Sequence, residues 1–398
     1  MKALLLENVH GDAEARLKAA GFSVETFPGA PGDKALAKRL KGVSLLGVRS
    51  RTQLTGGILC GADSLLAVGC FCVGTKNVDL AAAAGAGVAV FNAPYSSTRS
   101  VAELVIGELI MLQRSIFERS TALHAGKWDK TAKGAHEVRG KRLGIIGYGN
   151  IGGQVGILAE ALGLEVYFYD ILERLPFGNA RPCRSMRELL KKVDAVTLHV
   201  DDSPQNAGLI GEKQFKMMRP GALFINASRG KVADLKALAK HIRKGRIAGA
   251  AIDVYPKEPK SGQQKFHTNL RGLPNVILTP HIGGSTLEAQ KNIAAYVAGK
   301  LAQYVQTGDT FYNVTLPQVS LPVQVKSHRF LHIHKNVPGV MSQVTTLLAG
   351  HGINILGQHL KTTERIGYVI TDIAKKYDEG VIEALRGVRE TIRLRVLY

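Results

Sequence analysis

Three ionisable side chains, each placed directly after a short apolar run, could together perform proton and hydride chemistry. Arg229 follows the run ALFIN, Glu258 lies in AAIDVYPKEP and His281 lies in LTPHIGGS. A histidine can take a hydroxyl proton near neutral pH, and a carboxylate beside it would fix its tautomer and raise its pKa. An arginine fork can hold a carboxylate and polarise a carbonyl. Singly, the three could equally close a helix, carry a surface charge or fill a loop, but together they indicate oxidation of a hydroxy acid.

A glycine-rich turn earlier in the chain predicts the cofactor for this chemistry. Gly147, Gly149 and Gly152 form GxGxxG between the apolar run LGIIG and a helical stretch, and Asp170 ends the next apolar run. The first glycine permits a tight turn, the second lets the backbone approach a pyrophosphate, and the third lets helix pack on strand. Asp170 suits ribose hydroxyls and would repel a 2′-phosphate, so NAD is favoured over NADP. The alternative is a glycine-rich turn that binds nothing.

A pair of arginines in the first domain could bind a second anionic group. Arg49 and Arg51 flank Ser50 on a loop after the apolar run SLLGV. In an extended segment, residues two apart point the same way, so the two guanidinium groups could form a fork for a phosphate. The alternative is an ordinary pair of solvated arginines.

The elements around these residues alternate between strand and helix, which predicts parallel sheets covered by helices. Two long helices are expected near 101–123 and 286–306, and the stretch 316–325, rich in Pro, Val and Gln, is interpreted as a linker. From residue 329 the order becomes βαββαβ, typical of a separate small domain. The predicted fold class is therefore α/β, with two doubly wound domains (a flavodoxin-like substrate lobe and a Rossmann cofactor lobe) and a C-terminal ferredoxin-like domain.

Composition excludes several classes of protein. No apolar run is long enough to cross a bilayer and the first residues do not resemble a signal peptide, so a cytoplasmic protein is expected. The four cysteines form no CxxC pair, and no metal site is predicted. The net charge of +20 would attract anions. It is spread along the chain, and nucleic-acid-binding motifs are missing, so nucleic acid is not an expected partner.

The motifs GYGNIG, INASRG, AAIDVYPKEP and TPHIGGST occur in an order that resembles the D-isomer-specific 2-hydroxyacid dehydrogenases, and the resemblance covers essentially the whole chain. It implies catalytic roles for Arg229, Glu258 and His281. It also implies a discontinuous substrate domain (1–96 and 285–325), an NAD-binding domain (97–284) and a regulatory domain (326–398). The implied cofactor contacts are Gly147, Gly149, Asn150, Ile151, Gly152, Asp170, Ala227, Ser228, Arg229, Asp253, His281, Ile282, Gly283 and Gly284.

Other segments, among them GVRSRTQLT and VGCFCVGTKNVDL, resemble the short bacterial branch of this family that acts on D-3-phosphoglycerate. That branch implies phosphate binding by Arg49, Ser50 and Arg51, carboxylate binding by the backbone of Val73 and Gly74, and a further cation from Lys130. Such a site could also reduce 2-oxoglutarate. Glycerate or lactate as substrate is the nearer alternative. A non-enzymatic NAD-sensing corepressor is the more distant one.

The C-terminal unit resembles an ACT domain, a fold that binds amino acids at subunit interfaces. The resemblance implies that His334, Asn336 and Asn354 contact L-serine as an allosteric inhibitor, and that the chain forms a homotetramer. Alternatively, these residues are a helix cap and two turn residues. The linker VSLPVQVKSHRF contains no glycine, whereas related enzymes often carry a flexible glycine pair there, which puts the reach and strength of serine inhibition in question.

Overall fold

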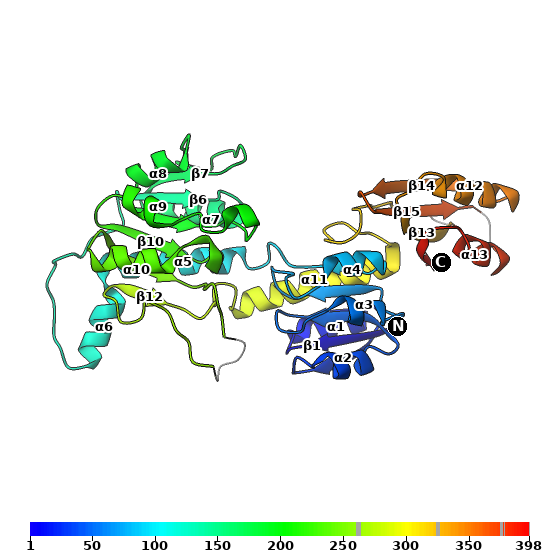
Figure 1. Cartoon of the computed structure of the whole chain (residues 1–398), viewed down its shortest axis with the longest axis horizontal. Helices are drawn as coiled ribbons and strands as arrows, with labels where there is room; N and C mark the ends of the chain where they lie inside the picture. Colours follow the sequence, from blue (N-terminus) through cyan, green and yellow to red (C-terminus); the bar gives the residue numbers. More distant parts are fainter. Residues whose placement is uncertain (260–263, 324–326, 375–376, 378, 398) are drawn as a thin grey trace. The chain divides into compact units, whose positions relative to one another are not determined.

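A computed structural model of the chain describes residues 1–259, 264–323, 327–374, 377 and 379–397. The chain forms two compact units, residues 1–96 with 290–398, and residues 97–289. Figure 1 shows the helices and strands of both units. No helix in these described ranges is both long and apolar enough to cross a membrane.

Unit 1 begins with a five-stranded parallel sheet of order β2-β1-β3-β4-β5, the flavodoxin-like order. Its elements are β1 (Lys2–Leu6), α1 (Gly11–Ala19), β2 (Ser23–Phe27), α2 (Asp33–Arg39), β3 (Val43–Val48), α3 (Gly56–Cys60), β4 (Ala67–Cys70), α4 (Leu80–Gly85) and β5 (Ala89–Phe91). Apolar side chains of α1 and of the long α11 (Leu287–Thr307) cover one face of this sheet. Side chains of α2, α3 and α4 cover the other.

Unit 2 is a Rossmann-type layer structure around a seven-stranded parallel sheet of order β12-β11-β10-β9-β6-β7-β8. Its strands are β6 (Arg142–Ile146), β7 (Glu165–Tyr169), β8 (Arg181–Pro182), β9 (Ala195–Leu198), β10 (Ala222–Asn226), β11 (Ile247–Ile252) and β12 (Val276–Leu278). The main helices are α5 (Thr98–Arg114), α6 (Ile116–His124), α7 (Asn150–Ala161), α8 (Met186–Lys192), α9 (Glu212–Met217) and α10 (Leu235–Arg243). Helices α5 and α7 pack on one face of the sheet, and α8, α9 and α10 pack on the other (Figure 1).

The C-terminal part of unit 1 is a four-stranded antiparallel sheet of order β14-β15-β13-β16. Its elements are β13 (His328–Lys335), α12 (Val340–Gly350), β14 (Ile355–Thr362), β15 (Ile366–Ile373), α13 (Glu379–Arg386) and β16 (Thr391–Val396). Apolar residues of α12 and α13 pack on one face. The predicted fold class, two parallel α/β sheets plus a βαββαβ domain, is therefore confirmed.

One local prediction was wrong, and a second missed how its segment packs. The single helix expected over 101–123 is two helices, because Ser115 adopts a left-handed conformation (φ 47°) and its N–H bonds to Leu112 O. No residue of α6 is buried, so core packing does not hold it in line with α5. The expected linker 316–325 is packed in its described part, since Leu316 is 4% and Val319 0% exposed. Residues 324–326 lie outside the described residues.

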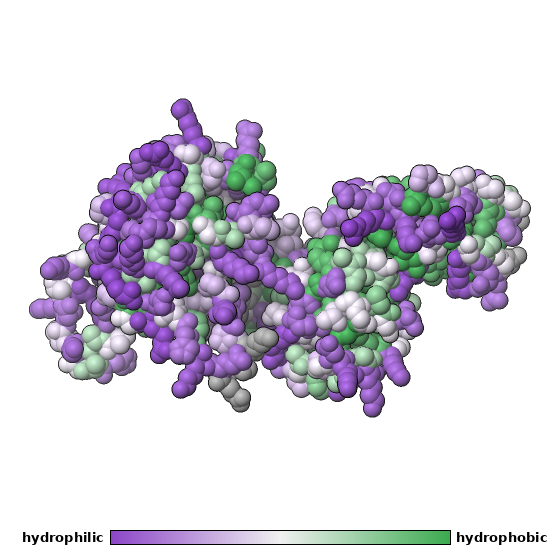
Figure 2. Space-filling view, viewed as in Figure 1, coloured by the Kyte–Doolittle hydropathy of each residue, from purple (hydrophilic) through white to green (hydrophobic). Residues whose placement is uncertain are grey.

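The C-terminal sheet shares a hydrophobic core with the parallel sheet of unit 1. Leu331, Ile333 and Tyr368 are buried in one cluster with Phe91 and Tyr304. Hydrophilic side chains are spread over the face of the molecule seen in Figure 2 and do not form a single band.

Candidate active site

The predicted base and its acidic partner are in contact in unit 2. His281 follows β12 and Glu258 follows β11, so both lie beyond the carboxyl ends of adjacent parallel strands. His281 Nδ1 lies 3.0 Å from Glu258 Oε2. This hydrogen bond raises the pKa of His281 against the opposing effect of burial. Burial tends to raise the pKa of the Glu258 carboxyl, but the bond to His281 brings it below its ordinary value.

The loop that carries His281 is fixed by Asp253, which is 1% exposed. His281 has a left-handed backbone (φ 57°), which an L-residue adopts only when its surroundings hold it there. Asp253 Oδ1 accepts the Ile282 N–H at 2.8 Å, and Oδ2 accepts the Gly283 N–H at 2.8 Å. The Thr279 hydroxyl donates to Asp253 Oδ1 at 2.6 Å. Asp253, expected as a cofactor contact, therefore also shapes the loop of the base.

Arg229 follows β10, the next strand in the sheet. Its Nη1 donates to Ser228 O at 2.7 Å, and Asn226 orders the turn by accepting from the Ser228 N–H and hydroxyl. The positive charge of Arg229 acts on both His281 and Glu258. Ala227, at the start of the same turn, is 9% exposed. The structure thus brings the three predicted catalytic side chains to one edge of one sheet.

The glycine-rich turn has the geometry that a pyrophosphate requires. Gly147 has φ +90°, and a Cβ there would lie 2.5 Å from His199 O, while a Cβ on Gly152 would lie 2.2 Å from Gly147 O. Nothing lies within 4 Å of a Cβ built on Gly149, the residue that caps α7. The cap makes no side-chain hydrogen bond, so the N–H groups of the first turn, which starts at Asn150 and Ile151, remain available to an anion.

Asp170 lies directly after β7, where the ribose of a dinucleotide is expected. Its Oδ2 accepts the Tyr148 N–H at 2.8 Å and its Oδ1 accepts the Leu172 N–H at 2.9 Å. The following segment exposes Ile171 (86%) and Leu175 (84%), apolar surface that would suit a flat ring. These residues therefore fit NAD.

The two arginines of unit 1 lie on a loop shaped by a buried glutamate that the sequence analysis did not single out. Glu7, 2% exposed, follows β1 and accepts the N–H groups of Arg49 (3.3 Å), Arg51 (3.0 Å) and Thr52 (2.8 Å). The Arg51 Nε also lies 3.5 Å from Glu7 Oε2. Ser50, between the arginines, is exposed. Glu7 could have been found as the acid at the carboxyl end of a parallel strand.

The remaining expected substrate contacts are accessible. Val73 O accepts from the Asn92 side chain at 2.6 Å, and nothing lies within 4 Å of a Cβ built on Gly74. The segment therefore has room for a ligand against its backbone. Lys130 is exposed in unit 2, in the segment after α6.

The three expected effector residues differ in exposure. His334 lies on β13, is 3% exposed and stacks on His332 with ring centroids 5.1 Å apart. Asn336 is exposed and donates to Thr363 O at 2.8 Å. Asn354 is exposed before β14, and its carbonyl accepts the Ala374 N–H at 3.1 Å. A Cβ on Gly367 would lie 2.2 Å from the His334 ring, so only glycine fits beside that histidine.

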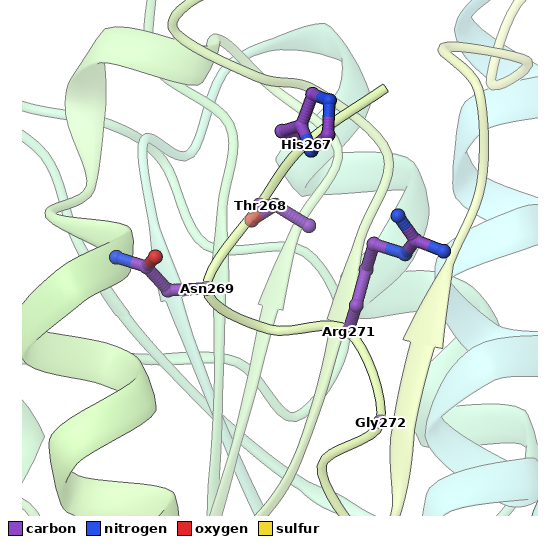
Figure 3. A pocket seen from close by; sticks show the side chains of 5 residues that line it. All are labelled: His267, Thr268, Asn269, Arg271 and Gly272. Carbon is purple, nitrogen blue, oxygen red and sulfur yellow. The ribbon is translucent and has the colours of Figure 1, made fainter. Parts of the chain in front are cut away.

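Two cavities lie near the β11–β12 connection. One of about 470 Å³ is lined by Tyr255, Phe266 and Thr279 together with Glu258 and His281, so it opens onto the catalytic pair. A second, of about 570 Å³, is lined by the segment 267–272. In Figure 3 the side chains of Asn269 and Arg271 point away from each other, so this second hollow does not gather its polar groups around one point.

Comparison with known proteins agrees with this arrangement. Residues 106–283 match the D-isomer specific 2-hydroxyacid dehydrogenase NAD-binding domain, and residues 330–393 match the AHAS small subunit-like ACT domain.

Full-length relatives and solved structures extend the match. D-3-phosphoglycerate dehydrogenase of Escherichia coli K12 is 48% identical over 401 residues, covering 100% of this chain and 98% of the relative. The Haemophilus influenzae protein of the same name is 47% identical, covering 100% and 97%. The structure of a D-2-hydroxyisocaproate dehydrogenase aligns with a TM-score of 0.70 at 25% identity, covering 79% of this chain and 100% of that one.

Proposed function

The chain belongs to the D-isomer-specific 2-hydroxyacid dehydrogenase family, and from that premise we propose that it oxidises D-3-phosphoglycerate to 3-phosphohydroxypyruvate with NAD, the first step of serine biosynthesis. The observation that carries the proposal is the His281–Glu258 hydrogen bond of 3.0 Å, formed beyond the strands of a dinucleotide-binding sheet. Relatives that match this chain over at least 97% of their own length and bear the name D-3-phosphoglycerate dehydrogenase support the substrate.

Each side chain has a distinct part in the reaction. Bound NAD would supply the acceptor for the hydride that leaves the hydroxyl-bearing carbon. Glu258 accepts the Nδ1 proton of His281, which leaves Nε2 as the basic atom that takes the hydroxyl proton. Arg229 holds the substrate carboxylate and stabilises the developing carbonyl. The same three groups would serve the reverse reduction of 2-oxoglutarate, because they contact only the hydroxy-acid end.

The phosphate of the substrate is assigned to Arg49, Ser50 and Arg51, with the substrate carboxylate on the backbone of Val73 and Gly74. What supports this is the way Glu7 organises the arginine loop through three backbone N–H groups. Lys130 adds a cation, from the same subunit or a neighbouring one. Lactate and glycerate lack the phosphate that such a loop would bind.

Regulation is assigned to the ACT domain, with L-serine contacting His334, Asn336 and Asn354 as an inhibitor. The N-cap of helix α12 is Gly339, which makes no side-chain hydrogen bond, so the first N–H groups of the helix could receive a carboxylate. We further propose that the enzyme is a homotetramer in the cytoplasm.

The experiment that tests the proposal is NADH formation across D-3-phosphoglycerate, glycerate and lactate, with and without serine. We expect turnover of the phosphorylated acid to exceed that of the others, and serine to reduce it. Preference for an unphosphorylated acid would contradict the substrate. Absence of any turnover, combined with retention on DNA at physiological salt, would favour a corepressor instead.

A further inference from the structure

A buried acid on α5 has no part in the mechanism above. Glu108 is 2% exposed, and neither of its carboxyl oxygens makes a hydrogen bond within the described residues. An unpaired buried carboxylate is costly, so a carboxyl group in such a place is ordinarily retained for a role that needs it.

The polar groups that act on Glu108 belong to the loop of the catalytic base. Burial has the largest effect on the pKa of Glu108 and raises it, the Asp253 charge raises it further, and a hydrogen bond donated by the Thr279 hydroxyl would lower it. That hydroxyl donates its single proton to Asp253 Oδ1 at 2.6 Å. Thr279 Oγ1 can then only accept a hydrogen bond from Glu108. An ionised Glu108 carboxylate is itself only an acceptor, so the two groups could not bond to each other. A hydrogen bond between them therefore requires Glu108 to bring the proton.

The surroundings of Asp253 favour its ionised form, whereas those of Glu108 favour its protonated form. Asp253 has three donors, two of them backbone N–H groups of the His281 loop, and these stabilise its negative charge. Glu108 has none of these. Burial raises the pKa of the Glu108 carboxyl to about 8, and the Asp253 charge contributes to the rise.

We propose that Glu108 is a positioning residue for catalysis, which holds a proton at neutral pH and donates it to Thr279 Oγ1. The resulting chain of hydrogen bonds runs from Glu108 through Thr279 to Asp253, and from Asp253 to the backbone that holds His281 in its left-handed conformation. Deprotonation of Glu108 places a second negative charge beside Asp253 and breaks this chain. The inference rests on the proposed role of His281 as base.

Other titratable groups surround this chain of hydrogen bonds and must be considered in any pH profile. Asp253 and Glu108 both raise the pKa of the Tyr255 phenol, after burial, which is the largest cause. The Tyr255 hydroxyl donates to Thr279 O at 3.0 Å, so it borders the same loop. Glu258 also acts on Tyr255, while Arg229 acts on His281. The pKa of the Tyr255 phenol is raised, so Tyr255 ionises far above the pH at which Glu108 does.

The test compares Glu108→Gln with Glu108→Leu in the full chain with NAD and 3-phosphoglycerate. The glutamine amide can donate to Thr279 at every pH, so we expect kcat within about twofold of wild type at pH 7. Its kcat relative to wild type should then rise as the pH passes about 8. The leucine, which donates nothing, should lower kcat about tenfold, as expected for one lost buried hydrogen bond, with little change in the KM for NAD. Gln113→Leu, at another buried polar position of α5, controls for repacking of the helix.

Equal kinetics of the glutamine and leucine variants, or a constant glutamine-to-wild-type ratio across this pH range, would overturn the proposal. Thermal unfolding gives a reading that needs no substrate. When folding raises the pKa of a buried acid, the protein loses stability as the pH rises from the pKa of that acid in the unfolded state to its pKa in the folded state. The Tm of Glu108→Gln should therefore increasingly exceed that of wild type between about pH 5 and pH 8. A constant Tm difference would contradict a protonated Glu108 even if the proposed substrate were wrong.

Discussion

At the scale of single residues, the proposed role of the His281–Glu258 pair predicts the pH dependence of the reaction. Oxidation needs an unprotonated imidazole, so kcat/KM should rise with pH through the pKa of His281. The hydrogen bond from Glu258 raises that pKa. In Glu258→Gln the amide no longer stabilises the protonated ring, so the rise should move to lower pH and the maximal rate should fall by about tenfold to a hundredfold. NADH formation measured from about pH 5 to pH 9 checks this.

The control for that experiment is His281→Ala, which should abolish turnover while NAD binding, followed by quenching of protein fluorescence or by calorimetry, stays unchanged. A pH profile of Glu258→Gln that overlays the wild-type profile would show that the carboxylate does not tune the base.

Arg51 belongs to the same scale, because its guanidinium is expected to contact only the phosphate group of the substrate. Arg51→Ala should raise the KM for 3-phosphoglycerate by about tenfold to a hundredfold, the loss of a charge-assisted contact. The KM for 2-oxoglutarate, which has no phosphate, should change little. The exposed Arg16 on α1 provides a matched control, since Arg16→Ala removes the same charge from the same unit. An equal increase of the KM for both substrates would show that Arg51 does not bind the phosphate.

The sequence predicted where the residues of local motifs lie in the fold, and the structure has them at those positions. Gly147, Asp170 and His281 each follow an apolar strand, and the position of a strand's carboxyl end can be recognised from the chain itself. Glu7 also follows an apolar strand and could have been found in this way. Glu108 could not, because its importance comes from groups as far as 171 positions away, which no local pattern encodes.

At the scale of elements, the loop that follows β3 depends on an acid from the end of β1. Glu7 itself has a left-handed backbone (φ 62°) and accepts three N–H groups from the loop. Burial raises the pKa of the Glu7 carboxyl, but these hydrogen bonds outweigh it and leave the pKa below its ordinary value. A lowered pKa means that the stabilisation is present at neutral pH and is lost as the pH falls through the folded value.

Glu7→Gln tests this element. A glutamine offers one acceptor oxygen in place of two, so at least one N–H loses its partner, at a cost of about 1–3 kcal/mol. We expect a lower Tm at pH 7, a difference that shrinks in acid, and a higher KM for 3-phosphoglycerate. Glu14→Gln, which breaks only the surface pair with Lys18, should leave both quantities nearly unchanged. A Tm equal to that of wild type at pH 7 would show that the loop does not depend on Glu7.

The errors of prediction at this scale also have physical causes. Apolar periodicity continues past Ser115, but no α6 residue is buried, so the periodic pattern there does not reflect a packed helix face. The stretch 316–325 is interpreted as a linker from its sequence because it is rich in Pro, Val and Gln. It is instead fixed by Arg329, whose guanidinium donates to Leu321 O at 3.0 Å and Pro322 O at 2.8 Å.

At the scale of the whole molecule, unit 1 combines the loop proposed to bind phosphate and the ACT domain in one packed body. Arg329 and Asp372 form an ion pair with both side chains fully buried, and Tyr368 donates to Gly308 O at 2.6 Å. A Cβ on Gly308, just after α11, would clash with Leu331 of β13, so the antiparallel sheet packs closely against the end of that helix. A glycine-free connection is consistent with this packing, because a domain held by a shared core needs no flexible hinge to stay in contact.

This packing leads to a prediction for regulation. If serine binds at Asn336, Asn336→Ala should raise the serine concentration for half-inhibition by at least about tenfold, the effect of losing a hydrogen bond to a charged ligand. The kcat without serine should be preserved, because the residue lies in the effector domain. Asn269→Ala, at an exposed asparagine of unit 2, is the matched control and should be inhibited like wild type. The measurement is the serine inhibition curve at a fixed concentration of 3-phosphoglycerate. An unaltered curve for Asn336→Ala would place the serine site elsewhere. Loss of kcat in the absence of serine would mean that the substitution disturbs the shared core and not the effector contact.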